Sequence, residues 1–221
     1  FGDGFGPDGA DTWPCLEIGQ IDENWPVVAS MILNAVGCTK IKIGARKTKL
    51  IQITSAECSS FLSANHLQGS INASIRYGLT YNGELVSVMC FGGSRFKQGE
   101  YELLRFANKI NYQVVGGASK LLTAFLNDNP IISTVISYAS RDISMGNMYT
   151  QIGFVEITKT SPAYMYFLNR IVYNRIKFQK HKLKDTLEIF DPNLSEWENM
   201  KNNGYNRFWN TGNIKYAYTR K

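Results

Sequence analysis

The first stretch that could do chemistry is a glycine turn directly before an amphipathic helix. Residues 113–118 read Gln-Val-Val-Gly-Gly-Ala, and residues 119–126 follow with apolar side chains at helical spacing. Glycines let the backbone approach a ligand closely, and the free N–H groups and dipole of a helix N-terminus favour a pyrophosphate. A plain turn is the alternative. The candidate ligand-binding residues are Gln113, Val115, Gly116, Gly117, Ala118 and Ser119.

His66 is a candidate general base and one of only two histidines in the chain. Imidazole, with an unperturbed pKa of ~6.5, is the natural proton acceptor at neutral pH. The alternative is that His66 caps the end of the helix expected before it, where a cation is favoured. Glu102 is a second base candidate, for which a surface ion pair is the alternative.

Tyr164 alternates with Met165 on a late expected strand, so one face of that strand could line a cleft.

His66 and Asp142 could also ligate a metal. Two candidate ligands are few for a metal site, and we therefore predict no metal. The four cysteines show no C-x-x-C spacing and indicate reduced thiols in a cytosolic protein.

Hydrophobic periodicity and turn residues predict the elements that must position these groups. Asn82-Gly83 is a strong hairpin signal, and the segment 41–50 is a basic strand or arm. The expected helices span 22–36, 56–64 and 119–126, with a short helix from 147 and another from 195. The expected strands span 73–81, 84–91, 101–107, 131–138, 154–158 and 163–168, and a hairpin covers 205–218 with its turn at 211–213. In this arrangement 163–168 completes the central sheet.

Composition and charge narrow the class of protein. The chain has 221 residues, of which 44% are hydrophobic and 13% aromatic, which favours a globular α/β domain over disorder. No apolar run is long enough to span a membrane and no signal peptide is visible, so we expect a cytoplasmic protein without a membrane partner.

The net charge of +6 is concentrated near the C-terminus. Residues 168–221 carry eleven Lys or Arg against five Asp or Glu, interleaved with aromatic rings. Such a mixture could follow a phosphate backbone and stack on bases, while a solvated basic face is the alternative. The candidate nucleic-acid contacts are Arg46, Lys47, Arg175, Lys177, Lys180 and Lys182.

Several runs together resemble the GNAT family of acyltransferases. More narrowly, they resemble phage-encoded GNAT-like domains that stand beside or are fused to homing-endonuclease-like nucleases and are remotely similar to the Mom DNA-modification proteins. The resemblance covers the chain from about Trp25 onward. The runs are N-H-L-Q-G at 65–69, E-L-L-R-F at 102–106, V-V-G-G-A-S-K at 114–120, S-Y-A-S-R-D at 137–142, G-N-M-Y-T-Q-I-G-F at 146–154 and S-P-A-Y-M-Y-F at 161–167.

The resemblance implies an α/β (α+β) GNAT-like fold with a mixed, mostly antiparallel sheet flanked by helices. It implies three parts: an N-terminal loop and helix at 1–40, a catalytic core at 41–168 and a basic extension at 169–221. The donor would be acyl-CoA, or another activated acyl donor such as an aminoacyl-tRNA or an aminoacyl-nucleotide.

The resemblance also assigns roles to residues. Tyr149 would protonate the departing thiolate, and Asn147 would help to bind the cofactor. His66 and Asp142 match positions that look functional in Mom-like proteins, and Asp142 could orient His66 or the acceptor amine. Asp142 also departs from the family, since an asparagine that helps to hold the cofactor is common at this position.

Three functions stay open at this point. The first is a transferase that adds an acyl or aminoacyl-type group to a base in DNA, in the cytoplasm of a bacterial host. The second is a catalytically inactive DNA-binding module that targets an associated nuclease. The third is an N-acyltransferase for a small amine or a protein. A shared open cleft for His66, Asp142 and the glycine turn would favour catalysis, and a collapsed cleft would favour the binding module.

Overall fold

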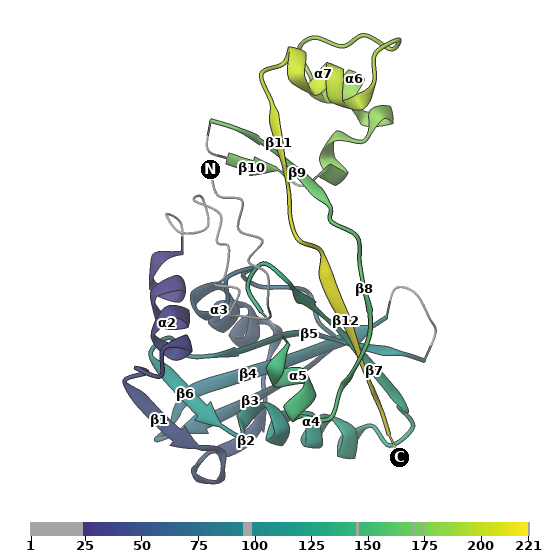
Figure 1. Ribbon diagram of the computed structural model, residues 1–221. Helices are drawn as coiled ribbons and strands as arrows, with labels where there is room; N and C mark the ends of the chain where they lie inside the picture. The colour runs from purple at the N-terminus through teal and green to yellow at the C-terminus, as the bar shows by residue number, and fades with distance from the viewer. Residues whose placement is uncertain (1–23, 95–98, 145, 170, 174, 221) are drawn as a thin grey trace, which may run out of the picture.

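The computed structural model describes residues 24–94, 99–144, 146–169, 171–173 and 175–220. Figure 1 shows a body built around one large sheet, from which an arm projects. The arm consists of residues 164–209. The predictions for residues 1–23, including the loop at 1–14, lie outside the described residues.

The body contains a seven-stranded sheet with the order β2-β3-β4-β5-β7-β12-β8. β5 and β7 are parallel, and the other neighbours in this sheet are antiparallel. The sheet therefore confirms the predicted fold class, an α/β fold with a mixed, mostly antiparallel central sheet. The strands are β2 (Lys49–Gln52), β3 (Ile75–Tyr81), β4 (Glu84–Gly93), β5 (Tyr101–Asn108), β7 (Thr134–Ser140), β8 (Val155–Lys159) and β12 (Asn213–Thr219).

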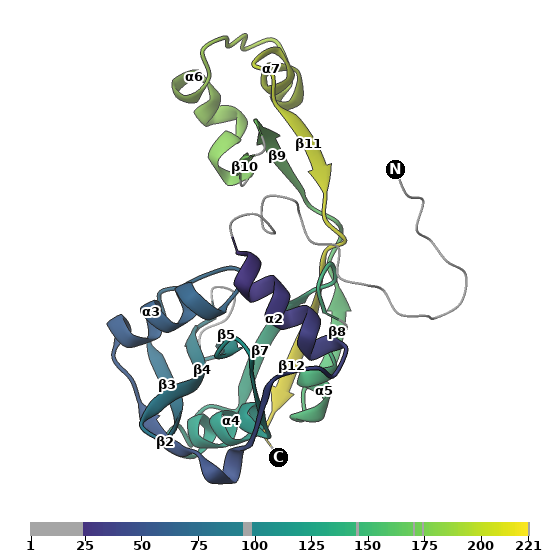
Figure 2. The same ribbon diagram turned by 90° about the vertical axis from the view of Figure 1, so that its left-hand side faces the viewer.

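Helices cover both faces of this sheet, as Figure 2 shows for α3 (Ser55–Asn65) and α4 (Gly117–Asp128). Successive residues of the central strand β4 point to opposite faces. Val88 therefore packs with α3, whereas Met89 packs with α4. This two-sided burial explains why β4 is apolar along most of its length. Within the described residues, no helix is both long and apolar enough to cross a membrane.

Local signals placed most of the elements of the body correctly. The α3 helix begins at a capping box, in which Thr54 accepts from the Glu57 N–H and the Glu57 carboxylate accepts from the Thr54 N–H. The predicted hairpin turn has φ of 51° at Asn82 and 81° at Gly83, as a two-residue turn requires. The first predicted helix is α2 (Trp25–Ala35), with Pro26 in its first turn.

The basic segment 41–50 is divided into three short elements. β1 (Ile41–Gly44) pairs in parallel with β6 (Tyr112–Val115), and the 3-10 turn η1 (Ala45–Lys47) connects β1 to the edge strand β2. This small β1–β6 sheet holds the strand that leads directly into the glycine turn.

The C-terminal quarter does not follow the predicted pairing. β9 (Tyr164–Leu168) was expected to complete the central sheet, but it pairs with β10 (Ile171–Tyr173) and β11 (Asn206–Trp209) in a separate sheet. The predicted hairpin at 205–218 is also wrong, because β12 enters the large sheet between β7 and β8. The stretch 169–221 is therefore not one extension. Alternating apolar residues mark a strand but do not specify its partner.

The arm has its own small core, with a carboxylate at its centre. Glu196, at the start of α7 (Glu196–Asn202), accepts from the Tyr164 hydroxyl at 2.8 Å and the Tyr166 hydroxyl at 2.9 Å, and it pairs with Arg175 at 3.1 Å. Burial by itself would raise the pKa of Glu196, but these hydrogen bonds outweigh it and hold the pKa below its ordinary value. The remaining elements of the arm are η2 (Arg175–Phe178), η3 (Lys180–Lys182) and α6 (Leu183–Thr186).

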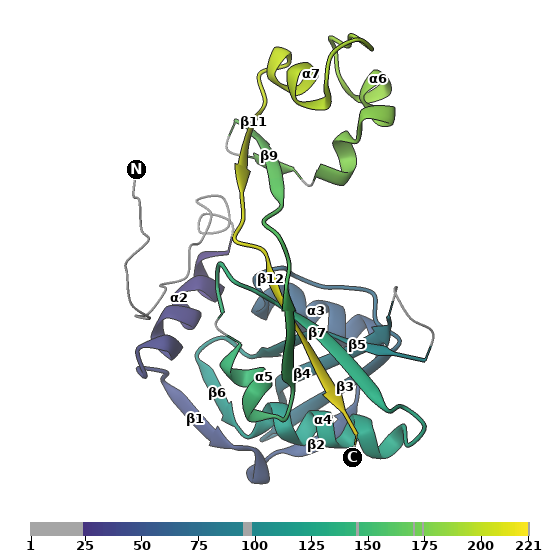
Figure 3. The same cartoon turned by 45° about the vertical axis from the view of Figure 1, so that its right-hand side comes forward.

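The chain leaves the body after β8 and returns through β12, and Figure 3 shows these strands side by side below the arm. The outgoing and the returning chain segments approach each other closely at Gly212, which has φ of +80°. A Cβ at this position would lie 2.5 Å from the Thr160 carbonyl oxygen. The Thr160 N–H donates to the Asn213 carbonyl at 2.8 Å, so this contact fixes the base of the arm.

We predict that Gly212→Ala destabilises the protein by about 2–4 kcal/mol, because left-handed strain adds to a clash with backbone atoms. Gly37→Ala is the matched control, since Gly37 has φ of +74° but no atom within 4 Å of a Cβ. The control is expected to cost only about 1–2 kcal/mol. Urea denaturation of both variants measures the difference, and equal costs would contradict the close crossing.

Candidate active site

The pairing of β5 and β7 ends almost as soon as it begins. Only Tyr101 with Val135 and Glu102 with Ile136 are paired in parallel, although β5 continues to Asn108 and β7 to Ser140. The two strands therefore part, and the ladder between them is interrupted. In this gap the Ser137 hydroxyl lies 2.9 Å from the Leu103 carbonyl oxygen.

The glycine turn follows β6 and begins α4. Gly116 is the N-cap and has φ of 79°, which favours glycine, and Gly117 packs against Val114. Gln113 pairs with Lys42 of β1, Val115 is exposed and Ala118 is buried. The predicted turn and helix are therefore in place. Whether these residues bind a cofactor stays a prediction.

A pocket lies beside this turn, and we call it the turn pocket. Its lining comes from η1, from the start of α4 and from the last residues of β1 and β6. Arg46 and Lys47, which the sequence suggested as DNA contacts, are exposed on η1 and line this pocket together with Ser119. Two cations and the positive end of a twelve-residue helix make it suitable for an anion.

Lys120 holds the two sides of the turn pocket together. Its Nζ donates to the Ala45 carbonyl at 3.0 Å and to the Thr48 carbonyl at 2.6 Å. These bonds fix η1 against the first turn of α4. Sequence reasoning missed this role, although a cation in the first turn of a helix opposes the helix dipole and therefore indicates a specific partner.

A second cavity, which we call the His66 cavity, has a volume of about 250 Å³. It lies between α2, the end of α3 and the end of β5, and its lining includes His66, Phe106 and Asn108. Asn108 Oδ1 is buried and has no hydrogen-bond partner among the described residues. Asn108 was not a predicted site residue.

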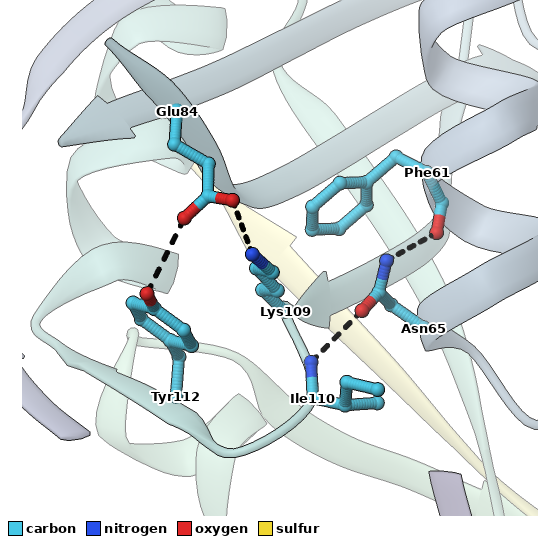
Figure 4. A network of polar contacts seen from close by, with 6 residues as sticks. All are labelled: Phe61, Asn65, Glu84, Lys109, Ile110 and Tyr112. Atoms are coloured by element: carbon cyan, nitrogen blue, oxygen red, sulfur yellow. Dashed lines mark hydrogen bonds and ion pairs between the residues drawn. The ribbon is translucent and has the colours of Figure 1, made fainter. Parts of the chain in front are cut away.

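Hydrogen bonds fix the wall of the His66 cavity, and Figure 4 shows them. Asn65 Oδ1 accepts from the Ile110 N–H at 2.8 Å, and the Asn65 amide donates to the Phe61 carbonyl at 2.8 Å. Lys109 pairs with Glu84, which also accepts from the Tyr112 hydroxyl at 3.3 Å. The end of α3 and the turn after β5 are therefore joined by side chains.

His66 is the C-cap residue of α3, and its Nδ1 accepts from the Gln68 N–H at 3.1 Å. Burial, with a smaller contribution from the Arg105 guanidinium, lowers the pKa of His66 to about 4. The ring is thus uncharged at neutral pH, which argues against a cationic helix cap. A base with so low a pKa is weak at neutral pH, so the ring is better suited to hydrogen bonding than to proton removal.

Asp142 is occupied by other partners. Its Oδ1 accepts from the Thr211 N–H at 2.9 Å and the Thr211 hydroxyl at 2.8 Å, and its Oδ2 accepts from Ser140 at 3.2 Å. These bonds tie the end of β7 to the chain returning from the arm. The charge that acts on His66 is that of Arg105, and the predicted orientation of His66 by Asp142 finds no support in this geometry.

Tyr149 lies in α5 (Asn147–Gln151) and stacks on Tyr216, with ring centroids 4.9 Å apart. Its hydroxyl oxygen is 3.0 Å from Ser137 Oγ, in the gap between β5 and β7. Burial raises the pKa of Tyr149, so the phenol is protonated at neutral pH but is a weaker acid than usual. Asn147 is exposed at the start of α5.

The structure places Tyr164 and Arg175 on the arm, where Tyr164 packs against the small core and Arg175 is exposed. The Arg175 guanidinium lies 4.5 Å from the centre of the Tyr164 ring, and both side chains contact Glu196. Lys177 and Lys180 are exposed on the arm, whereas Lys182 is partly buried and its Nζ donates to the Ile176 carbonyl at 3.0 Å. Within the described ranges, no three His, Cys, Asp or Glu side chains are grouped so that they could hold a metal ion.

Solved acetyltransferase structures are similar to much of this chain. One from Bacillus subtilis in complex with CoA is 14% identical over 79% of this chain and 100% of that chain, with a TM-score of 0.46. A GNAT family acetyltransferase from Elizabethkingia anophelis with acetyl-CoA bound is 13% identical over 79% and 99%, with a TM-score of 0.46. A ribosomal-protein alanine N-acetyltransferase from Escherichia coli is 12% identical over 78% and 93%, also with 0.46. The sequence matches no known family and no curated protein.

We predict that the His66 ring stays neutral from pH 8 down to about pH 5, with its proton on Nε2, because burial opposes the charged form and Nδ1 is occupied. Long-range 1H–15N spectra of the imidazole measure both the tautomer and the pKa. A titration midpoint near the ordinary value of ~6.5 would contradict the burial of this ring.

The same shift has a consequence for stability. As the pH falls below ~6.5, the unfolded chain binds a proton at His66 before the folded chain does, so the free energy of unfolding decreases down to about pH 4. His66→Gln is expected to make this decrease smaller. Denaturant titrations of both proteins at pH 7 and pH 5 provide the comparison.

Proposed function

We propose that this chain is a GNAT-fold acyltransferase whose donor binds along the line from the turn pocket to the gap between β5 and β7. The observation that carries this proposal is the position of the cationic turn pocket at the end of β6, the strand that continues from β5. Phosphates on the glycine turn would leave the acyl group to be held where the two strands part.

Acyl-CoA fits this arrangement, because it carries its phosphates at the end opposite to the reactive thioester. The residues that would hold its phosphates are Arg46, Lys47, Ser119 and the N–H groups after Gly116. An aminoacyl-tRNA or an aminoacyl-nucleotide offers the same combination of phosphate and activated acyl group. Arg46 and Lys47 are thus assigned to the donor rather than to DNA.

Tyr149 is the group best placed to act on the leaving atom. Its hydroxyl lies in the gap beside Ser137, and as a phenol with a raised pKa it keeps its proton at neutral pH. A thiol has a pKa of about 8.5, so full proton transfer from this phenol to a thiolate is uphill. Tyr149 would therefore stabilise a developing thiolate mainly by donating a hydrogen bond.

For the acceptor we propose a base in DNA, presented by the arm. The exposed Lys177 and Lys180, together with the partly buried Lys182, support contact with a phosphate backbone. Arg207 lies 4.4 Å from the Trp197 ring and 4.8 Å from the Trp209 ring, and Trp209 is 55% exposed and offers a face for stacking. An inactive DNA-binding module that works with a nuclease is the alternative, and so is a transferase for a small amine or a protein.

The donor site predicts a specific loss of binding. The Arg46→Ala, Lys47→Ala double variant should bind CoA roughly 10-fold more weakly than the unmodified chain, because two charge-assisted contacts to phosphate are lost. Isothermal titration calorimetry at two salt concentrations measures this loss and its salt dependence. Lys49→Ala is the matched control, since Lys49 is exposed on β2 and does not line the turn pocket. Equal affinity of the double variant and the unmodified chain would exclude this donor site.

The acceptor is tested by nucleoside mass spectrometry of plasmid DNA from cells that express the chain. A new nucleoside is expected with the unmodified chain, and its mass shift identifies the group transferred. The triple variant Lys177→Gln, Lys180→Gln, Lys182→Gln should form much less of it, because phosphate contacts are lost. Unchanged DNA together with salt-sensitive duplex binding would instead support the binding module.

A further inference from the structure

The Ser137 hydroxyl joins β5, β7 and α5 where the two strands part. Ser137 is 1% exposed, and its Oγ lies 2.9 Å from the Leu103 carbonyl oxygen and 3.0 Å from the Tyr149 hydroxyl oxygen. A carbonyl oxygen has no hydrogen, so Ser137 is the donor in the bond to Leu103. Because a serine hydroxyl has one hydrogen, Ser137 must then accept from Tyr149.

In this arrangement the Tyr149 hydroxyl has no hydrogen left for a ligand. A phenol also has one hydrogen, and here it is donated to Ser137. If Tyr149 turns that hydrogen towards a leaving sulfur, Ser137 can keep the contact by turning its own hydrogen from the Leu103 carbonyl to the Tyr149 oxygen. The pair therefore has two arrangements, which differ by the rotation of two hydroxyl groups.

The Tyr149 ring itself is held firmly. Tyr216 of β12 pairs with Ser137 of β7 in antiparallel register, so both side chains point to the same face of the sheet. The Tyr149 ring stacks on Tyr216 with an interplanar angle of 12°, and Tyr216 is 2% exposed. A Cβ at Gly146, the N-cap of α5, would clash with the Tyr216 hydroxyl. The helix therefore begins directly against Tyr216, and rotation of the Tyr149 hydroxyl requires no movement of the ring.

The groups around Tyr149 act on its pKa in opposite directions. Burial has the largest effect and raises the pKa, whereas the contact with Ser137 lowers it, because a hydroxyl that turns to donate to a phenolate favours the charged form. The Arg105 guanidinium also lowers the pKa, by less than Ser137 does, and Glu102 and Tyr216 raise it. Ser137 is thus the strongest of the groups that stabilise negative charge on the Tyr149 oxygen.

We propose that Ser137 is a positioning residue for the transfer, which accepts from Tyr149 in the free protein and donates to it while Tyr149 donates to the leaving sulfur. This proposal rests on the proposed function. The acceptor nitrogen forms a bond to the acyl carbon, and the bond from that carbon to sulfur breaks with its electron pair on sulfur. The acceptor nitrogen releases one proton to water or to the thiolate. Ser137 and Tyr149 keep their own protons and redirect two hydrogen bonds.

The test uses the full chain with 3-fluorotyrosine in place of Tyr149, so that 19F NMR reports on one ring among twelve tyrosines. A pH titration of this signal measures the pKa of the phenol. Ser137→Ala removes the donor to the phenolate, so the pKa should rise by about one to two pH units. Ser137→Thr keeps a hydroxyl group at this position and should restore the pKa of the unmodified chain.

Ser87→Ala is the matched control. Ser87 is a fully buried serine of β4, and its hydroxyl donates to the Ala107 carbonyl at 3.3 Å. Its replacement removes a buried hydroxyl and a bond to a backbone carbonyl, as Ser137→Ala does, but no tyrosine is involved. The pKa of residue 149 should therefore stay unchanged in Ser87→Ala.

A second measurement tests the donor separately. CoA and desulfo-CoA, which lacks the thiol, are added to the unmodified chain that carries the fluorinated ring. CoA is expected to shift the 19F signal because its sulfur accepts from the phenol, whereas desulfo-CoA should bind without this shift.

The two measurements have separate outcomes. An unchanged pKa in Ser137→Ala, or an equal rise in Ser87→Ala, would overturn the role of Ser137. A response to CoA without the rise in Ser137→Ala would remove this inference and leave the proposed transferase. The rise in Ser137→Ala without any response to CoA would support the exchange of hydrogen bonds and remove the proposed donor site.

Discussion

The early end of the β5–β7 pairing is the constraint on which the rest of the candidate site depends. Beyond Glu102, β5 stays paired with β4, while β7 stays paired with β12, so each half of the sheet is complete on its outer side. Fully paired strands would close the sheet and leave no opening beside the glycine turn. Ser137 and Tyr149 occupy the gap with hydroxyl groups, which can exchange partners more easily than a backbone ladder can.

One continuous segment supplies both ends of the site. From Phe106 to Tyr112 it lines the His66 cavity, and from Val115 to Lys120 it lines the turn pocket. The two places differ in charge, because the turn pocket carries the exposed Arg46 and Lys47, whereas Lys109, the charged residue in the described lining of the His66 cavity, is paired with Glu84.

The sequence predicted those features that depend on neighbouring residues. The glycine turn, the Asn82-Gly83 hairpin and the helices that follow Thr54 and Ser195 were predicted because their signals lie within a few positions. The place of β12 in the sheet was not found, because strand pairing across 50 or more residues leaves no local mark. For the same reason the bonds between Asp142 and Thr211 were not predicted, since they bridge 69 positions.

The base of the arm also has a consequence for how such a chain can change over evolution. The two chain segments that connect the body to the arm are joined by the hydrogen bond from the Thr160 N–H to the Asn213 carbonyl. Both segments continue into paired strands of the large sheet. A short turn could close the body at this point without altering any strand order. This geometry would allow the arm to be exchanged, enlarged or lost while the strand order of the large sheet below it is kept.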